Sequence, residues 1–250
     1  MYNKIKTPDE IQAMQEGGKI LARILQELRD AAKPGMTTKQ LAQLAATRLH
    51  DFHTEPVTLG YHGFPDVLCV SVNEEVVHGI PREDKVLQEG DILSLDLVVK
   101  YKGMITDAAI TLPVGKVKPE IQRFIDTTRQ SLYKGIDAVT GAVRVGDISN
   151  AVEKTLKNAG YGVVEDLVGH GVGHEMHEAP NIPNYGREGS GPLLKPGMTI
   201  AIEPMATLGG HEVYCDRDGW TIKTADNSVA AHFEHTILLT EHGAEILTQL

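Results

Sequence analysis

The chain has 250 residues, of which 41% are hydrophobic and 23% are charged, which is enough for one large domain with a sizeable core. Its 34 acidic and 24 basic residues give a formal net charge of −10, which argues against a basic nucleic-acid-binding surface. The absence of an apolar signal core, of a membrane-length apolar run and of a cysteine metal motif predicts a cytoplasmic globular protein.

The first half is predicted to contain two helices followed by strands. Residues 7–10 (Thr-Pro-Asp-Glu) combine a capping hydroxyl, a first-turn proline and two acids, and apolar residues then recur on one helical face. Residues 33–35 (Lys-Pro-Gly) end this helix, and Thr38 is expected to cap the second one. Strands are expected over 67–72, 92–101 and 104–112, with a turn at 102–103.

The second half is predicted to repeat this order. A break at 113–119 contains proline and glycine, and helical patterns follow over about 120–139 and 148–159. The remaining strands are expected over about 163–168, 199–207, 221–224 and 232–240.

Short echoes between the halves favour a duplicated unit, with boundaries of about 1–115 and 118–250, although each echo alone could arise by chance. In both halves a leucine precedes a glycine by three residues and an acid follows it by six: Leu87, Gly90 and Asp96, then Leu194, Gly197 and Glu203. The simplest architecture is a single α+β domain with one curved antiparallel sheet. Helices would cover its convex face and leave the concave face free for a site.

Four acids occupy strand positions where an unpaired charge costs several kcal/mol. In the strand at 92–101 the leucines alternate with Asp96, so Asp96 faces away from the helices, and Glu203 is likewise opposite the isoleucines before it. Clustered carboxylates with one glycine-flanked imidazole suit a pair of divalent cations. Any one of these residues could instead make a structural ion pair. The full set is Asp96, Asp107, His170, Glu203 and Glu234.

Several motifs resemble those of type I methionine aminopeptidases, and the resemblance covers about the whole chain. It is carried by residues 60–65 (GYHGFP), 71–81 (SVNEEVVHGIP), 169–173 (GHGVG), 195–199 (KPGMT), 202–205 (IEPM) and 234–236 (EHT). The ordered series Asp, Asp, His, Glu, Glu is typical of the wider pita-bread metallohydrolases. The segment His-Gly-Ile-Pro beginning at His78 narrows the resemblance to this subfamily.

The resemblance implies a pita-bread fold and two divalent metal ions, with cobalt, manganese, iron or zinc as candidates. It implies that Asp96 chelates one ion, that Asp107 and Glu234 bridge both, and that His170 and Glu203 complete the shell of the other. The expected reaction is attack on the first peptide bond by a water that the metals acidify.

The resemblance also implies the catalytic and substrate-binding residues. Glu203 would shuttle the proton, His177 would bond to the carbonyl oxygen and His78 would contact the scissile amide nitrogen. Met176 departs from the aromatic residue usual in the family, Phe64 replaces a frequent tyrosine, and the pair His174-Glu175 after the glycine loop is unusual. The expected methionine pocket consists of Tyr61, Phe64, Cys69, Met176 and Trp220.

The sequence thus predicts a short, bacterial-like aminopeptidase that removes the initiator methionine from polypeptides with a small second residue. The expected partners are the N-termini of nascent polypeptides, bound near the ribosome. No nucleic-acid-binding motif and no membrane contact are expected, and the protein is expected to be a monomer. Only 26 positions separate His177 from Glu203, which leaves no room for the insertion of the type II branch. The alternatives are a proline-specific peptidase of the same fold and a binding protein of that fold without metals.

Overall fold

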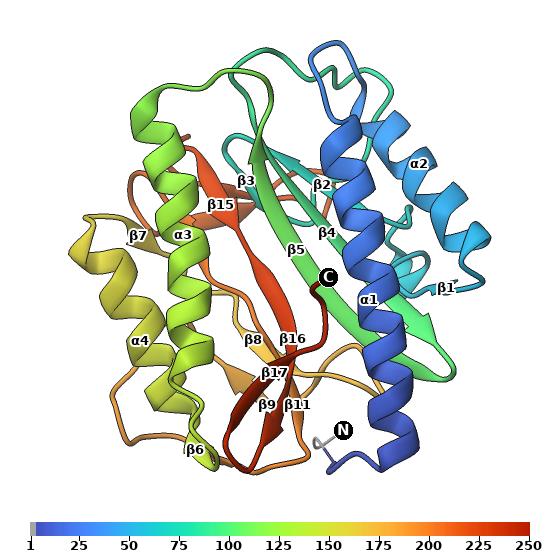
Figure 1. Cartoon of the computed structure of the whole chain (residues 1–250). Coiled ribbons are helices and arrows are strands. Elements are labelled where there is room, and N and C mark those ends of the chain that lie inside the picture. The colour runs from blue at the N-terminus through green and yellow to red at the C-terminus, as the bar shows by residue number, and fades with distance from the viewer. Residues whose placement is uncertain (1–3) are drawn as a thin grey trace.

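A curved antiparallel sheet forms the centre of the computed structural model, which describes residues 4–250. Within these residues the sheet has nine strands in the order β1-β4-β5-β16-β11-β8-β9, with β17 added to β16 and β2 added to β4 (Figure 1). Its strands are β1 (Glu55–Pro56), β2 (Cys69–Val72), β4 (Ile92–Tyr101), β5 (Met104–Pro113), β8 (Gly169–Gly171), β9 (Glu178–Ile182), β11 (Thr199–Ile202), β16 (Glu234–Thr240) and β17 (Gly243–Ile246).

Three small sheets flank the central one in the described part of the chain. A short 3-10 turn, η1 (Tyr61–Gly63), lies between β1 and β2. The small sheets consist of β6 (Val143–Arg144) with β10 (Leu193–Leu194); β7 (Gly162–Val163), β12 (Met205–Thr207) and β15 (Ala230–His232); and β3 (Glu75–Val77), β13 (Val213–Cys215) and β14 (Ile222–Thr224).

Four long helices cover one face of the central sheet, as predicted. They are α1 (Pro8–Ala31), α2 (Thr38–Asp51), α3 (Pro119–Asp137) and α4 (Val145–Asn158). Figure 1 shows α1 and α3 in front of the central strands, with α2 and α4 farther out. None of the helices within residues 4–250 is both long and apolar enough to cross a membrane.

The helix starts confirm the first predicted cap and correct two other boundaries. Thr7 and Glu10 form a capping box at α1. The cap of α2 is Thr37 rather than Thr38, because the Thr37 hydroxyl accepts from the backbone N–H of Gln40, whereas the Thr38 hydroxyl bonds to the backbone of Arg82. The helix α4 begins three residues before the predicted start.

The strands predicted over 92–101 and 104–112 are confirmed as the β4–β5 hairpin. The strand predicted over 67–72 is β2, which is shorter than predicted because it begins at Cys69. The strand predicted over 163–168 is wrong beyond Val163, because β7 pairs with β12 over only two residues. The strands predicted over 199–207 and 232–240 each divide in two. Pro204 has no N–H to donate and interrupts the first, and Phe233 separates β15 from β16 in the second.

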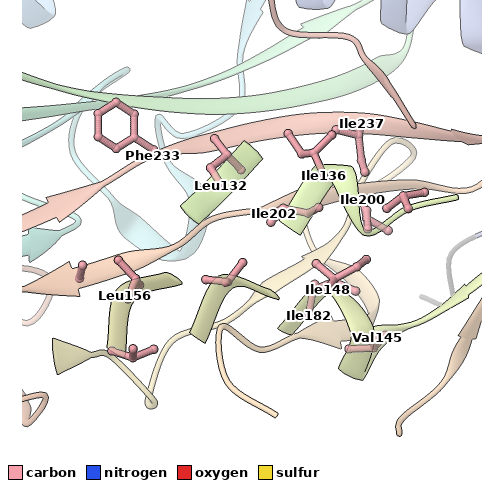
Figure 2. Close-up of a cluster of buried hydrophobic side chains, with 14 of the residues drawn as sticks. Leu132, Ile136, Val145, Ile148, Leu156, Ile182, Ile200, Ile202, Phe233 and Ile237 are labelled. Atoms are coloured by element: carbon pink, nitrogen blue, oxygen red, sulfur yellow. The ribbon is translucent and has the colours of Figure 1, made fainter. Parts of the chain in front are cut away.

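Two hydrophobic clusters fix the helices on the sheet. One packs α1 and α2 against the side chains of Leu93, Leu95 and Leu97. The other packs α3 and α4 against β11 and β16, and Figure 2 shows Ile200, Ile202 and Ile237 beside Ile136 and Ile148. Because side chains alternate along a strand, this burial turns Asp96 and Glu203 towards the opposite, concave face.

Candidate metal centre and substrate pocket

Two neighbouring strand pairs pass from one sheet to another at the same level, and this change of sheet positions two site residues. Ile202 of β11 pairs with His235 of β16 in the central sheet, while Met205 of β12 pairs with His232 of β15 in a three-stranded sheet. Glu203 and Glu234 therefore lie at the two bends between the sheets. A strand acid is tolerated there because the bend interrupts the apolar packing on either side.

The strand register brings the other two carboxylates to the same place. Asp96 pairs with Ala109 across β4–β5, and Ala109 pairs with Glu234 across β5–β16. Asp107 lies two residues from Ala109 and so shares its face. The backbone N–H and C=O of Asp107 both bond to the hydroxyl of Thr236, at 2.9 and 2.8 Å, which holds β5 and β16 together at this point.

The structure brings the five predicted ligands together, and the donor atoms of three of them fit a cation site. Nε2 of His170 lies 3.9 Å from Oδ2 of Asp107 and 3.4 Å from Oε1 of Glu203. Asp107, His170 and Glu234 each offer a ligand atom within 4.8 Å of the others. Oδ1 of Asp107 and Oε1 of Glu234 are buried without a hydrogen-bond partner, which is expensive unless a cation joins them.

His170 has the orientation of a metal-ligating histidine. Its Nδ1 lies 2.9 Å from the carbonyl oxygen of Gly171, which leaves Nε2 to face the carboxylates. Gly169 is required beside it, because a Cβ there would lie 2.5 Å from the carbonyl oxygen of Ala201 on the adjacent strand. Burial lowers the pKa of His170 to about 3, so the imidazole is neutral and can donate a lone pair.

Burial raises the pKa of all four carboxyl groups when no cation balances them. The pKa of Asp96 is raised to about 7. Burial and then the charge of Asp96 raise the pKa of Asp107 well above its usual value. Burial and then the charge of Asp107 do the same for Glu203 and Glu234. Such mutually repelling acids are expected to bind divalent cations with release of protons.

In the metal-free protein, the buried carboxyl of Asp96 is expected to lower stability as the pH rises from about 4 to about 7. The Asp96 carboxyl has a pKa near 7 in the folded state against 3.8 as its ordinary value. Between these values the unfolded chain has released the proton and the folded chain holds it, so rising pH favours unfolding. Above about pH 6.5 the buried histidines are neutral in the folded and in the unfolded chain, so melting temperatures measured in chelator should fall as the pH rises further, and added Mn²⁺ should restore them most at high pH.

Two substitutions test whether the carboxylate cluster causes that pH dependence. Asp107→Asn should make the dependence shallower, because one buried acid can no longer ionise. Asp137→Asn is the matched control, since the side chain of Asp137 is 67% exposed. Melting temperatures that rise with pH above about 6.5 in chelator, or an equal effect of both substitutions, would contradict the assignment.

His78 and its neighbours form a tight turn at the edge of the cluster. His78 has a φ of 58°, in a left-handed region that residues other than glycine rarely adopt. The next position, Gly79, requires glycine because a Cβ there would lie 2.3 Å from the carbonyl oxygen of Val70. Val70 donates to the carbonyl of Gly79, and Gly79 donates to the hydroxyl of Ser71. Burial lowers the pKa of His78 to about 4.

One cavity connects the predicted pocket residues with the carboxylate cluster. The rings of Phe64 and Trp220 meet edge to face at 5.2 Å, and Cys69 pairs with Asp96 across β2–β4. Cys69 and Cys215 are both free thiols. All five predicted pocket residues, both predicted histidines and Asp96 line this cavity: Tyr61, Phe64, Cys69, His78, Asp96, Met176, His177 and Trp220.

The segment that contains Met176 and His177 is tied to the N-terminal residues. Glu178 accepts backbone N–H bonds from His174 and Glu175 at 2.8 and 3.1 Å, and its other oxygen lies 3.4 Å from Nζ of Lys6. The side chains of Lys6 and Glu178 are fully buried. His174 reaches Glu10 of the α1 capping box at 2.8 Å, so this unusual residue joins the glycine loop to the first helix.

Sequence reasoning missed His232, the Lys6–Glu178 pair and the lining residues Thr58 and Val98. Nε2 of His232 lies 3.6 Å from Oε2 of Glu203, and neither ring nitrogen has a hydrogen-bond partner within the described residues. His232 lies two positions before Glu234, and in a strand this spacing places both side chains on the same face, which could have suggested that His232 belongs to the site. Lys6 and Glu178 are 172 positions apart, and no pattern in the sequence links them.

The chain is similar to known proteins in its sequence and in its fold. The family model described as metallopeptidase family M24 matches residues 12–241. A methionine aminopeptidase from Clostridium acetobutylicum is 45% identical over 98% of both chains. A crystal structure of a methionine aminopeptidase from Thermotoga maritima superposes with a TM-score of 0.97 at 46% identity, covering 99% of this chain and 100% of that one.

A prolidase from Pyrococcus furiosus shares the fold alone. It superposes with a TM-score of 0.78 at 22% identity, and the likeness covers 98% of this chain but only 65% of the prolidase. The predicted fold class and the predicted family are therefore both confirmed, and a family of this kind uses divalent metal. By its sequence, its fold and its carboxylate cluster, the chain belongs to metallopeptidase family M24 and, within that family, to the methionine aminopeptidases.

Proposed function

We propose that this chain hydrolyses the first peptide bond of polypeptides that begin with methionine, preferring a small second residue. The observation that carries the proposal is that Asp96 belongs both to the carboxylate cluster and to the lining of the apolar cavity. A side chain held in this cavity would place the bond next to it beside the acids. The 45% identity to a methionine aminopeptidase from Clostridium acetobutylicum supports the same activity.

The cavity lining supports methionine as the residue removed. Met176 and Cys69 are buried, and sulfur-containing side chains adapt well to a flexible thioether. The rings of Phe64 and Trp220 provide aromatic edges for contact with the substrate sulfur. Apolar walls with few polar groups are typical of pockets that recognise an aliphatic side chain.

We propose that Asp96, Asp107, His170, Glu203 and Glu234 hold two divalent cations, drawn from manganese, cobalt, iron or zinc. Four carboxylates can balance four positive charges, and a shell of oxygens with one imidazole suits these metals. Divalent cations supply Lewis acidity, which makes water acidic and the carbonyl carbon electrophilic. Titration of metal-stripped protein with Mn²⁺ should give two equivalents, and one equivalent would refute the two-ion proposal.

The protein groups then have distinct roles. Glu203, flanked by His170 and His232, would take a proton from the attacking water and pass it to the leaving amine nitrogen. His177 would donate to the carbonyl oxygen as negative charge develops there. His78, which also lines the cavity, would contact the scissile amide nitrogen.

We further propose that the chain acts as a monomer in the cytoplasm on newly made polypeptides. The net charge of −10 gives no general attraction to nucleic acid, so contact near the ribosome would depend on the emerging N-terminus itself. Methionine-initiated N-termini are the substrates that the cavity and the family both favour. Association measured by analytical ultracentrifugation would test the monomer.

Hydrolysis of two short peptides tests the activity. Metal-stripped protein is assayed on Met-Ala-Ser and on Ala-Pro-Ala, with and without Mn²⁺ or Co²⁺. Release of methionine from the first peptide alone, and only with metal, is expected. Cleavage of Ala-Pro-Ala instead would identify a proline-specific peptidase, and no turnover with any metal would favour a binding protein of this fold.

A further inference from the structure

Tyr61 and His177 make a direct side-chain hydrogen bond at the cavity. The phenolic oxygen of Tyr61 lies 2.9 Å from Nδ1 of His177, and the two rings meet edge to face with centroids 5.5 Å apart. The His177 ring also contacts the ring of His170 edge to face at 4.4 Å. The proposed pocket role uses only the ring of Tyr61, so its hydroxyl is left without a function.

The backbone holds both partners of this bond in place. Tyr61 lies in η1, where Gly60 at a φ of 82° and His62 at a φ of 47° form a tight turn, and Gly60 donates to the carbonyl of Phe64 at 2.8 Å. His177 directly precedes β9, where Glu178 is anchored by the buried Lys6. The 2.9 Å contact thus joins two fixed segments that are 116 positions apart in the chain.

The direction of this hydrogen bond is linked to which nitrogen of His177 keeps the proton. A neutral imidazole has one N–H donor and one acceptor nitrogen, and the partner of one nitrogen sets the state of the other. Burial, and then the charge of Glu175, raise the pKa of Tyr61, so its hydroxyl keeps its proton and is able to donate it in the bond to Nδ1. When this hydroxyl donates to Nδ1, the ring proton of His177 is on Nε2.

We propose that Tyr61 is a positioning residue whose hydroxyl fixes the Nε2–H tautomer and the ring orientation of His177. The Nε2–H is then available to donate to the carbonyl oxygen of the scissile bond, and no reorientation is needed during the reaction. This inference rests on the proposed function, in which His177 contacts that oxygen. It separates two contributions of Tyr61: its ring forms a pocket wall and its hydroxyl acts through His177.

Kinetics of Tyr61→Phe separate these two contributions, because the substitution keeps the ring and removes the hydroxyl. For Met-Ala-Ser, kcat should fall about tenfold, equivalent to about 1.4 kcal/mol, with KM nearly unchanged. Tyr214→Phe is the matched control, since Tyr214 is 45% exposed and lies outside the cavity lining. In a His177→Ala background, Tyr61→Phe should have no further effect, because its partner is already absent.

Nuclear magnetic resonance of ¹⁵N-histidine-labelled, zinc-loaded protein tests the tautomer without turnover. The His177 resonances are assigned by their loss in His177→Ala. In the unsubstituted protein, the protonated signal should belong to Nε2, and Nδ1 should show the shift of a hydrogen-bonded acceptor. In Tyr61→Phe the Nδ1 signal should move to that of a free acceptor, whereas Tyr214→Phe should leave it unchanged.

Each contrary result overturns the inference. These results are a proton on Nδ1 in the unsubstituted protein, an unchanged kcat in Tyr61→Phe, a rise in KM at constant kcat, or an equal loss in the His177→Ala background. A protein that cleaves no Met-Ala-Ser would instead refute the proposed function, while the resonance spectra would still test the Tyr61–His177 bond.

Discussion

Glu203→Gln is expected to lower kcat for Met-Ala-Ser by about 10²- to 10⁴-fold, the usual contribution of a positioned general base. The amide has the shape of the carboxylate but cannot accept a proton. Glu203 lies between His170 at 3.4 Å and His232 at 3.6 Å, and its side chain is only 13% exposed, so bulk water cannot readily replace it as proton acceptor. The amide oxygen can still act as a metal ligand.

Stability and metal content distinguish lost chemistry from lost structure in this variant. Burial raises the pKa of Glu203, so the neutral amide resembles the protonated acid, and the metal-free melting temperature should not fall. Glu188→Gln, at an exposed position, is the matched control and should keep full activity. Methionine release by Glu203→Gln at the unsubstituted rate, at equal metal content, would remove Glu203 from the mechanism.

Lys6→Met is expected to lower the free energy of unfolding by about 3–5 kcal/mol, because it leaves a buried carboxylate without its cation. The Lys6 and Glu178 side chains are both fully buried, with 3.4 Å between Nζ and Oε2. Glu178 also holds the backbone of His174 and Glu175, next to Met176 and His177. The loss of stability should therefore be accompanied by a fall in kcat, measured on the folded fraction.

A double variant and an exposed pair provide the controls for Lys6→Met. Lys6→Met combined with Glu178→Gln removes both charges, and urea unfolding should show that it recovers much of the lost stability. The same substitution in the exposed pair Lys102–Glu16, Lys102→Met, should leave stability nearly unchanged. A similar loss for Lys6→Met and Lys102→Met would show that burial of the first pair has no special importance.

The organisation of the fold could be predicted wherever local patterns determine structure. The Thr7 cap, the alternation around Asp96 and the turn at 102–103 each depend on neighbours within a few residues, and the structure contains all three features. The limits of β7 and the division of the predicted strand 232–240 into β15 and β16 depended instead on which partner strand was present. A strand ends where its partner ends, and the partner is distant in sequence.

Motif spacing and side-chain alternation are local properties, and they were sufficient to predict the family, the sheet with helices on one face and the residues that gather in the carboxylate cluster. Three features became visible only in the folded chain. The bends at Glu203 and Glu234 coincide, Lys6 forms an ion pair with Glu178, and the Tyr61 hydroxyl forms a hydrogen bond with Nδ1 of His177. These contacts join residues more than 20 positions apart. Their geometry follows from strand register and core packing, which depend on the whole chain at once.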